Sequence, residues 1–409
     1  MFQPRHLHLI DPGLKTVAGH NLTQDLSIAR ECKRQGIPVT IYAGKGSSLG
    51  ILDFNLVETF QLDIFSEVTP QRSEFSVFES FFLINRIFLS DLSSISTDLF
   101  SNQDLVYFPN ITQNQLEAVV DWVMGIPFAN RPALAITLRY LNSHMLYNTS
   151  RGYGPTIEFL YSHILPKLLE RYPRTYLFTD TKVLTENYSR LSGSQVITLP
   201  IPHIDMEHDY VRSKSISGEL SILYIGGWAQ YHGSDFLPGV IESVLIDFPN
   251  VKFTIQVNSA PDSEDRRTMA ALDLAFAPRI KVLYGSLSTE EYANTLQAAD
   301  IVLLLYLPSH YSFASSGVFT EAAALGKVLV VTAGTTLETS VKDFELGAVV
   351  VPEFTLDSCA ASVKNAIVNF PELDQRANNN YTRFSDINSP KGFLNAMFTH
   401  IGISDAHIV

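Results

Sequence analysis

Short runs of apolar residues alternate along this chain with longer stretches in which apolar and polar residues mix at helical spacing. The runs have the length of strands and carry almost no charge, which is typical of parallel strands buried on both faces. They cover residues 6–10, 39–42, 104–108, 133–138, 176–179, 196–199, 220–225, 251–257, 280–284, 301–306 and 328–331, with a weaker candidate at 56–62. This alternation predicts an α/β fold with doubly wound parallel sheets.

The mixed stretches predict the helices between these strands. Two capping boxes are expected, Asn21 with Gln24 and Ser288 with Glu291, and each opens a helix. Further helices are predicted at 113–124, 156–169, 234–246, 263–272 and 356–368, and an amphipathic run at 393–401 suits a final helix. The aromatic-rich segment 70–100 is expected to supply mostly core residues, with an acceptor-facing or membrane-facing surface as the alternative.

The length of the chain indicates more than one domain. A chain of 409 residues suits two domains of about 200 residues each. Pro200 and Pro202 stiffen the chain where the first set of strands ends, which predicts a hinge there. We therefore expect domains at 1–202 and 203–385, followed by a terminal segment, 386–409, that packs back on the first domain.

Residues 300–337 carry the clearest local signal for chemistry. A buried strand ends in a polar loop over 307–316, and Ser316 then caps a helix that begins at Gly317 and ends at Gly326. A helix start at the carboxyl end of a parallel sheet favours a phosphate, because backbone N–H groups and the helix dipole both attract anions. Glu321 follows one turn later, where its carboxylate could accept hydrogen bonds from a ribose diol.

The segment from Ser316 to Lys327 resembles the nucleotide-sugar signature of GT-B glycosyltransferases of family 4, and weaker similarity spans nearly the whole chain. The resemblance implies two Rossmann-like domains facing a cleft. It also implies glycosyl transfer from a nucleoside-diphosphate sugar to a hydroxyl of a glycan or glycolipid acceptor, in polysaccharide or glycoconjugate synthesis. Enzymes of this family retain the anomeric configuration and use neither a metal ion nor another cofactor.

The same resemblance assigns candidate site residues. Those implied to bind the donor are Gly19, Gly226, Gly227, Ser315, Ser316, Gly317, Val318 and Glu321. Those implied to take part in catalysis are His20, Arg139 and His232. His20 has a structural alternative, that of a histidine at a helix entry.

Four positions depart from the family pattern. Phe313 stands where a sugar-contacting Glu is usual, and Arg139 stands where a His is usual. Ala229 and His232 replace an Arg and a Lys that neutralise the diphosphate, so Lys327, Arg266, Arg267 or Arg139 would have to supply that charge. The missing Glu and the missing basic pair support a rival hypothesis, a catalytically silent GT-B protein that binds nucleotide or glycan or assists a partner enzyme. An epimerase or a phosphorylase of the same architecture is a third hypothesis.

Composition narrows the class of protein further. With 46% hydrophobic and 17% charged residues the chain is globular, and a net charge of −13 argues against general nucleic-acid binding. Cys32 and Cys359 have no metal or redox spacing, and no Walker A, HExxH, GxSxG or GxGxxG motif occurs. The first residues do not resemble a secretion signal, which predicts a cytoplasmic protein. Peripheral membrane association and oligomer formation stay open.

Overall fold

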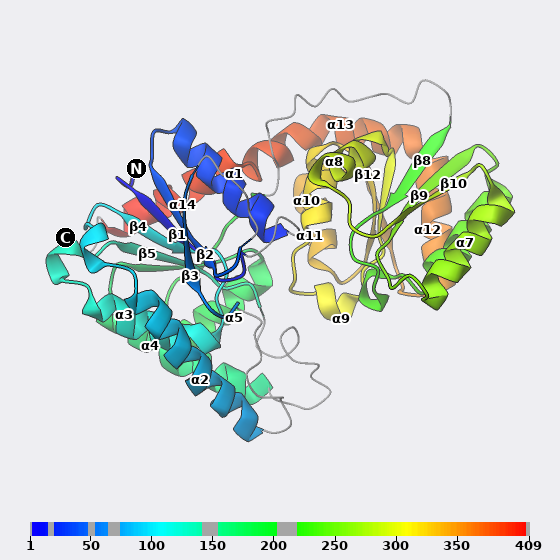
Figure 1. Cartoon of the computed structure of the whole chain (residues 1–409). Coiled ribbons are helices and arrows are strands. Elements are labelled where there is room, and N and C mark those ends of the chain that lie inside the picture. Colours follow the sequence, from blue (N-terminus) through cyan, green and yellow to red (C-terminus); the bar gives the residue numbers. More distant parts are fainter. Residues whose placement is uncertain are drawn as a thin grey trace. The chain divides into compact units, whose positions relative to one another are not determined.

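A computed structural model describes residues 2–14, 20–47, 54–63, 74–140, 154–202 and 219–405, with side chains left out at 20–23, 74–76, 154 and 405. The chain divides into two compact units (Figure 1). Unit 1 comprises Met1–Pro202 together with Pro390–Val409, and unit 2 comprises His203–Ser389. Each unit contains one parallel sheet, as the alternation of strands and helices predicts.

The described part of unit 1 contains a seven-stranded sheet in the order β3-β2-β1-β4-β5-β6-β7. Its strands are β1 (Leu7–Ile10), β2 (Val39–Gly44), β3 (Asn55–Phe60), β4 (Leu105–Phe108), β5 (Ala133–Thr137), β6 (Thr175–Thr179) and β7 (Ile197–Thr198). Its helices are α1 (His20–Arg34), α2 (Glu74–Ser93), α3 (Gln113–Gly125), α4 (Gly154–Arg171), α5 (Lys182–Ser192) and α14 (Pro390–Asp405). The strand order reverses between β1 and β4, so the loops that follow these two strands diverge at that point.

The C-terminal helix α14 completes the core of unit 1. It contacts α1, and its apolar side chains join those of β1, β2 and β4 in one buried cluster that includes Phe393, Leu394, Met397, Phe398 and Ile401. Each of these five side chains is at most 2% exposed. The amphipathic spacing over 393–401 reflects this packing.

The described part of unit 2 contains a six-stranded sheet in the order β10-β9-β8-β11-β12-β13. Its strands are β8 (Leu220–Tyr224), β9 (Val251–Val257), β10 (Ile280–Tyr284), β11 (Ile301–Leu304), β12 (Val328–Thr332) and β13 (Ala348–Val351). Its helices are α6 (Leu237–Asp247), α7 (Glu264–Phe276), α8 (Thr289–Ala298), α9 (Pro308–Tyr311), α10 (Gly317–Ala324), α11 (Thr336–Phe344), α12 (Leu356–Val368) and α13 (Phe370–Ile387).

Alternate residues of these strands enter two separate cores. Ile222, Leu303 and Val330 pack with helices α6 and α12, whereas Leu223 and Leu304 pack with α10 and α11. Burial on both faces explains why the central strands β11 and β12 are nearly continuous apolar runs.

Several local predictions are wrong in detail. Helix α1 begins at His20, so Asn21 lies inside the first turn and does not cap it. The interval 307–316 contains the one-turn helix α9, because Pro308 fixes a helical φ angle at its first position. A 3-10 turn (Gln230–His232) precedes α6, which begins three residues later than expected at Leu237. The Ser288–Glu291 capping box and the Ser316 cap are confirmed.

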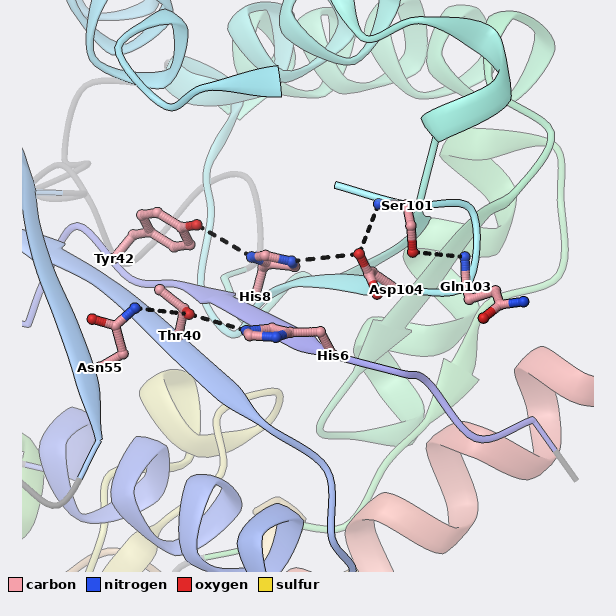
Figure 2. Close-up of polar contacts among 8 residues, drawn as sticks. All are labelled: His6, His8, Thr40, Tyr42, Asn55, Ser101, Gln103 and Asp104. Atoms are coloured by element: carbon pink, nitrogen blue, oxygen red, sulfur yellow. Dashed lines mark hydrogen bonds and ion pairs between the residues drawn. The ribbon is translucent and has the colours of Figure 1, made fainter. Parts of the chain in front are cut away.

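A polar cluster lies within unit 1 at the amino end of β1 (Figure 2). His8 is 3% exposed, its Nδ1 hydrogen-bonds the Tyr42 hydroxyl at 3.2 Å, and its Nε2 lies 3.8 Å from Asp104 Oδ2. His6 stacks on His8 with ring centroids 4.4 Å apart and hydrogen-bonds Thr40 at 3.0 Å. Burial, and the neighbouring His6, lower the pKa of His8 to about 3, so its imidazole is neutral.

Candidate functional site

The first part of the candidate site in unit 2 is the loop that follows β8. Gly226 and Gly233 have φ angles of 115° and 81°, which favour glycine. A Cβ at Gly233 would lie 2.4 Å from the backbone oxygen of Leu305, so this glycine lets the loop pack against the chain that follows β11. The backbone N–H groups of Gly226 and Trp228 donate to side chains of Gln256 and Asn258, which fixes the loop.

The second part is the start of helix α10. Ser316 is buried, and its hydroxyl accepts a hydrogen bond from the Phe319 N–H at 3.2 Å. The Thr320 N–H donates to the Ser316 carbonyl, while the N–H groups of Gly317 and Val318 have no hydrogen-bond partner among the described residues. Two free donors at a helix N-terminus form an anion-binding position.

These two parts meet where the strand order of the sheet reverses. Strand β8 pairs with β11, and the loops after both strands belong to the carboxyl edge. A Cβ at Gly226 would lie 3.4 Å from Cγ2 of Val318, which shows that the glycine loop touches the start of α10. In open α/β sheets this switch point is where ligands bind.

Glu321 is partly buried on α10 and is held by a residue that the sequence reasoning missed. The hydroxyl of Tyr292, on α8, donates a hydrogen bond of 2.5 Å to Glu321 Oε2. Burial raises the pKa of Glu321 to about 7, and the bond from Tyr292 acts against this rise. The carboxyl therefore titrates near neutral pH. Because Tyr292 lies 29 positions before Glu321, no local pattern could have revealed the pair.

His232 is tethered through both nitrogens of its ring. Nδ1 lies 2.6 Å from the carbonyl oxygen of Gly227, and Nε2 lies 2.7 Å from the Tyr311 hydroxyl. A carbonyl oxygen only accepts, so Nδ1 carries a proton and donates it to Gly227. The ring of Tyr306 packs beside His232 with centroids 4.8 Å apart. His232 thus braces the glycine loop against the residues that follow β11.

The candidate cations differ in their position on unit 2. Lys327 is 4% exposed and precedes β12, and its Nζ donates to the Gln297 carbonyl at 2.6 Å, so it lies at the amino edge of the sheet, away from α10's start. Arg266 lies at the carboxyl edge, where its guanidinium stacks over the ring of Tyr284 at 4.9 Å. Phe313, in the place of the family's Glu, is a buried apolar side chain.

The remaining sequence candidates belong to unit 1. Gly19 and the side chain of His20 lie outside the described residues. Arg139 follows β5 at the carboxyl edge of the sheet, where Asp180 raises its pKa against the opposing effect of burial. Two buried carboxyls near it, Asp11 and Asp25, were also missed from the sequence. Ser315 lies just before the α10 cap in unit 2, with Ser316, Gly317 and Val318.

Solved structures of similar fold cover nearly the whole chain. Sucrose-phosphate synthase from Thermosynechococcus elongatus is 14% identical over 99% of both chains, with a TM-score of 0.63. The chain has the GT-B fold. HepE of Anabaena, solved with UDP and glucose, is 13% identical over 98% of this chain and 100% of its own, with a TM-score of 0.62. A putative UDP-N-acetylglucosamine 2-epimerase from Listeria monocytogenes is 11% identical over 98% and 97%, with a TM-score of 0.60.

No protein-family profile and no curated protein sequence matches this chain. Within the ranges that the structure describes, no helix is long and apolar enough to cross a membrane. The same described ranges contain no group of three His, Cys, Asp or Glu residues that could hold a metal ion. GT-B neighbours with different activities mean that the function has to be argued from the site itself.

Proposed function

We propose that this GT-B protein transfers a glycosyl group from a nucleoside-diphosphate sugar to an acceptor hydroxyl. The observation that carries the proposal is the uncapped pair of N–H groups at Gly317 and Val318, at the switch point of a parallel sheet, with Glu321 one turn later. The two N–H groups can donate hydrogen bonds to a phosphate, and the Glu321 carboxylate can accept hydrogen bonds from a ribose. The GT-B neighbour HepE, whose structure contains UDP and glucose, supports the same assignment.

In this proposal the donor diphosphate lies at the start of α10, beside the glycine loop of Gly226 and Gly227. Hydrogen bonds from the backbone stabilise the charge that develops on the leaving diphosphate, and the site acts mainly by positioning. Arg266 is the candidate cation on this unit's carboxyl edge. We propose further that the reaction retains the anomeric configuration of the sugar and needs no metal ion.

The second candidate, a silent nucleotide or glycan binder, is favoured by a specific observation. Phe313 is buried and cannot contact a sugar through a carboxylate, and both ring nitrogens of His232 already have partners. If His232 contacts the diphosphate, it must first give up its bond to Tyr311.

The test has two stages. Thermal unfolding is first measured with UDP, GDP, dTDP and CMP and with their sugars, because specific binding to the folded state raises the midpoint. Release of the free nucleotide is then followed with mixed glycan acceptors, with and without EDTA. Binding with turnover supports the transferase, and binding without turnover supports the silent binder. A lack of binding to every nucleotide refutes the transferase and the silent nucleotide binder, and leaves a silent glycan binder.

A matched pair of variants localises the binding. Gly317→Val crowds the phosphate position and is expected to abolish the thermal shift. Gly125→Val adds the same side chain at the end of α3, where a Cβ meets no atom within 4 Å, and is expected to leave the shift unchanged. Equal shifts in the two variants would contradict the assignment to α10.

A further inference from the structure

Three helices cover one face of the sheet in unit 2, and their last turns expose large apolar side chains. Helix α6 contacts both α7 and α12, and all three helices bury side chains in the same core. Leu274 on α7 is 85% exposed, Ile246 on α6 is 68% exposed and Val368 on α12 is 66% exposed. Helices α6 and α7 end where strands β9 and β10 begin, so these side chains belong to the amino edge of the sheet. We call the three side chains the helix-end patch.

Polar contacts hold the ends of these helices together. Arg279, directly before β10, donates from Nη1 to the carbonyl of Leu245 at 2.8 Å, which ties the chain after α7 to the end of α6. The Nζ of Lys364, on α12, lies 2.6 Å from Oδ2 of Asp247, the last residue of α6. A surface that is already fixed loses little conformational entropy when a partner covers it.

Small side chains surround the helix-end patch. The exposed residues beside it include the alanines 270, 271 and 275 of α7 and 361 of α12. Small residues let another helix approach closely, and the three larger side chains can then act as apolar anchors of a contact. Exposed apolar side chains that gather in one place mark an interaction surface.

The charges at the helix ends favour a second copy of this chain as the partner. The chain has a net charge of −13, so two copies repel each other unless the faces in contact are nearly neutral. Asp247 and Lys364 cancel each other, and Asp273 and Arg279 bring one charge of each sign at the end of α7. A balanced surface of this kind gains nothing from anionic lipids, which attract clusters of basic residues.

The dimensions of the face are also those of a small dimer interface. Helix α6 has 11 residues, and α7 and α12 have 13 each, so the helices are about 16–20 Å long. With axes about 10 Å apart, three helices present a face of roughly 20 by 30 Å. This projected area of roughly 600 Å² approaches the ~800 Å² that each partner buries in a standard interface.

We propose that two copies of this chain form a twofold dimer through the outer faces of α6, α7 and α12. The helix-end patch of each copy packs on that of the other, and Lys364 of each copy faces Asp247 of the other. A twofold contact uses the same surface on both copies, so the assembly closes at two. This inference goes beyond glycosyl transfer and does not depend on it.

Sedimentation velocity of the full chain tests the dimer over about 1–100 µM, the range suited to a small interface. The mass should rise with concentration from 45.6 kDa to twice that value. Added NaCl should not dissociate the dimer, because apolar burial is not screened by salt. A single-chain mass at every concentration, or dissociation by NaCl, overturns the proposal. Growth beyond two copies overturns the twofold contact.

Variants localise the interface. Leu274→Glu and Ile246→Glu should each raise the dissociation constant of the dimer at least tenfold, because each would bury a charge. Phe128→Glu is the matched control, since Phe128 is 84% exposed in unit 1 and should leave the dimer unchanged. Thermal unfolding verifies that each variant folds. A dimer that survives both unit 2 variants, or an equal loss in Phe128→Glu, overturns the assignment to this face.

Two further comparisons separate this proposal from its alternatives. Flotation with phosphatidylcholine vesicles tests a lipid partner. A monomeric chain that binds these vesicles, and loses the binding in Leu274→Glu, overturns the dimer in favour of a membrane surface. Gly317→Val should abolish the nucleotide-induced thermal shift while the dimer persists, and Leu274→Glu should do the reverse, because the two positions lie at opposite edges of the sheet.

Discussion

Glu321 should make donor binding depend on pH. Its pKa is about 7, so the acid and the carboxylate coexist near neutral pH. A ribose hydroxyl donates more strongly to a carboxylate than to an acid, so the nucleotide binds the ionised form. The ionised fraction falls from roughly 90% at pH 8 to roughly 10% at pH 6, which raises the apparent dissociation constant about tenfold, or about 1.4 kcal/mol.

The same carboxyl should affect stability with the opposite sign. In the unfolded chain it ionises at its ordinary pKa of 4.5, whereas the folded protein keeps the proton up to about pH 7. The folded state therefore binds more protons between these values, and stability falls as the pH rises through them, by at most about 3 kcal/mol. Glu321→Gln should remove this loss, so that the variant gains stability over the wild type at pH 8 but not at pH 4.

Calorimetric titration at pH 6, 7 and 8 measures the effect, with the nucleotide sugar that gives the largest thermal shift. A nucleotide sugar has no titrating phosphate in this range, so a slope reports the protein. Glu321→Gln should flatten the slope. Tyr292→Phe should move its midpoint to higher pH, because the Tyr292 hydroxyl lowers the pKa of Glu321. A flat wild-type profile, or a slope that survives Glu321→Gln, would refute contact between Glu321 and the ribose.

Three further predictions concern single positions. Gly317→Val should weaken nucleotide binding at least tenfold at nearly unchanged unfolding temperature, measured by titration and thermal unfolding, since Gly317 needs no positive φ angle. Gly233→Ala should lower the unfolding midpoint, because its Cβ would lie 2.4 Å from Leu305 O; an unchanged midpoint would contradict this packing. The pKa of His8 is about 3 in the folded protein and 6.5 in the unfolded chain. The folded protein should therefore lose stability as the pH falls below 6.5, by at most about 1.4 kcal/mol per pH unit. Denaturant titration of His8→Phe should show a shallower acid limb, and an identical limb would exclude His8 as its source.

The parts of the site that were predictable rest on local signals. Ser316 precedes a run of strong helix formers and Glu321 follows one turn later, so both could be found by reading along the chain. The strands were also predictable, because burial on both faces leaves no polar residue to interrupt an apolar run. Strand β13 was not predicted, for two reasons. Its residues other than Val351 are only half-buried, and a strand of four residues is too short to show a period.

The parts that were not predictable depend on contacts between distant segments. Tyr292 on α8 donates a hydrogen bond to Glu321 on α10, and Asp11 after β1 contacts Asp25 on α1 because α1 packs back over the sheet. The two members of each pair are separated in sequence by distances that follow no motif, so only the folded structure shows that they are in contact. The tether of His232 to Tyr311 is of the same kind, and it gives this histidine a structural role as a brace of the glycine loop.

The position of α14 has a consequence for synthesis on the ribosome. Unit 2 is one continuous segment of the chain, so its core is complete as soon as that segment has been translated, and it can fold during translation. Residues 1–202 of unit 1 precede unit 2, but their core lacks Phe393, Met397 and Ile401 until α14 has been translated after unit 2. During that interval the apolar side chains that α14 will cover lack their partners, and such exposed apolar surface favours aggregation.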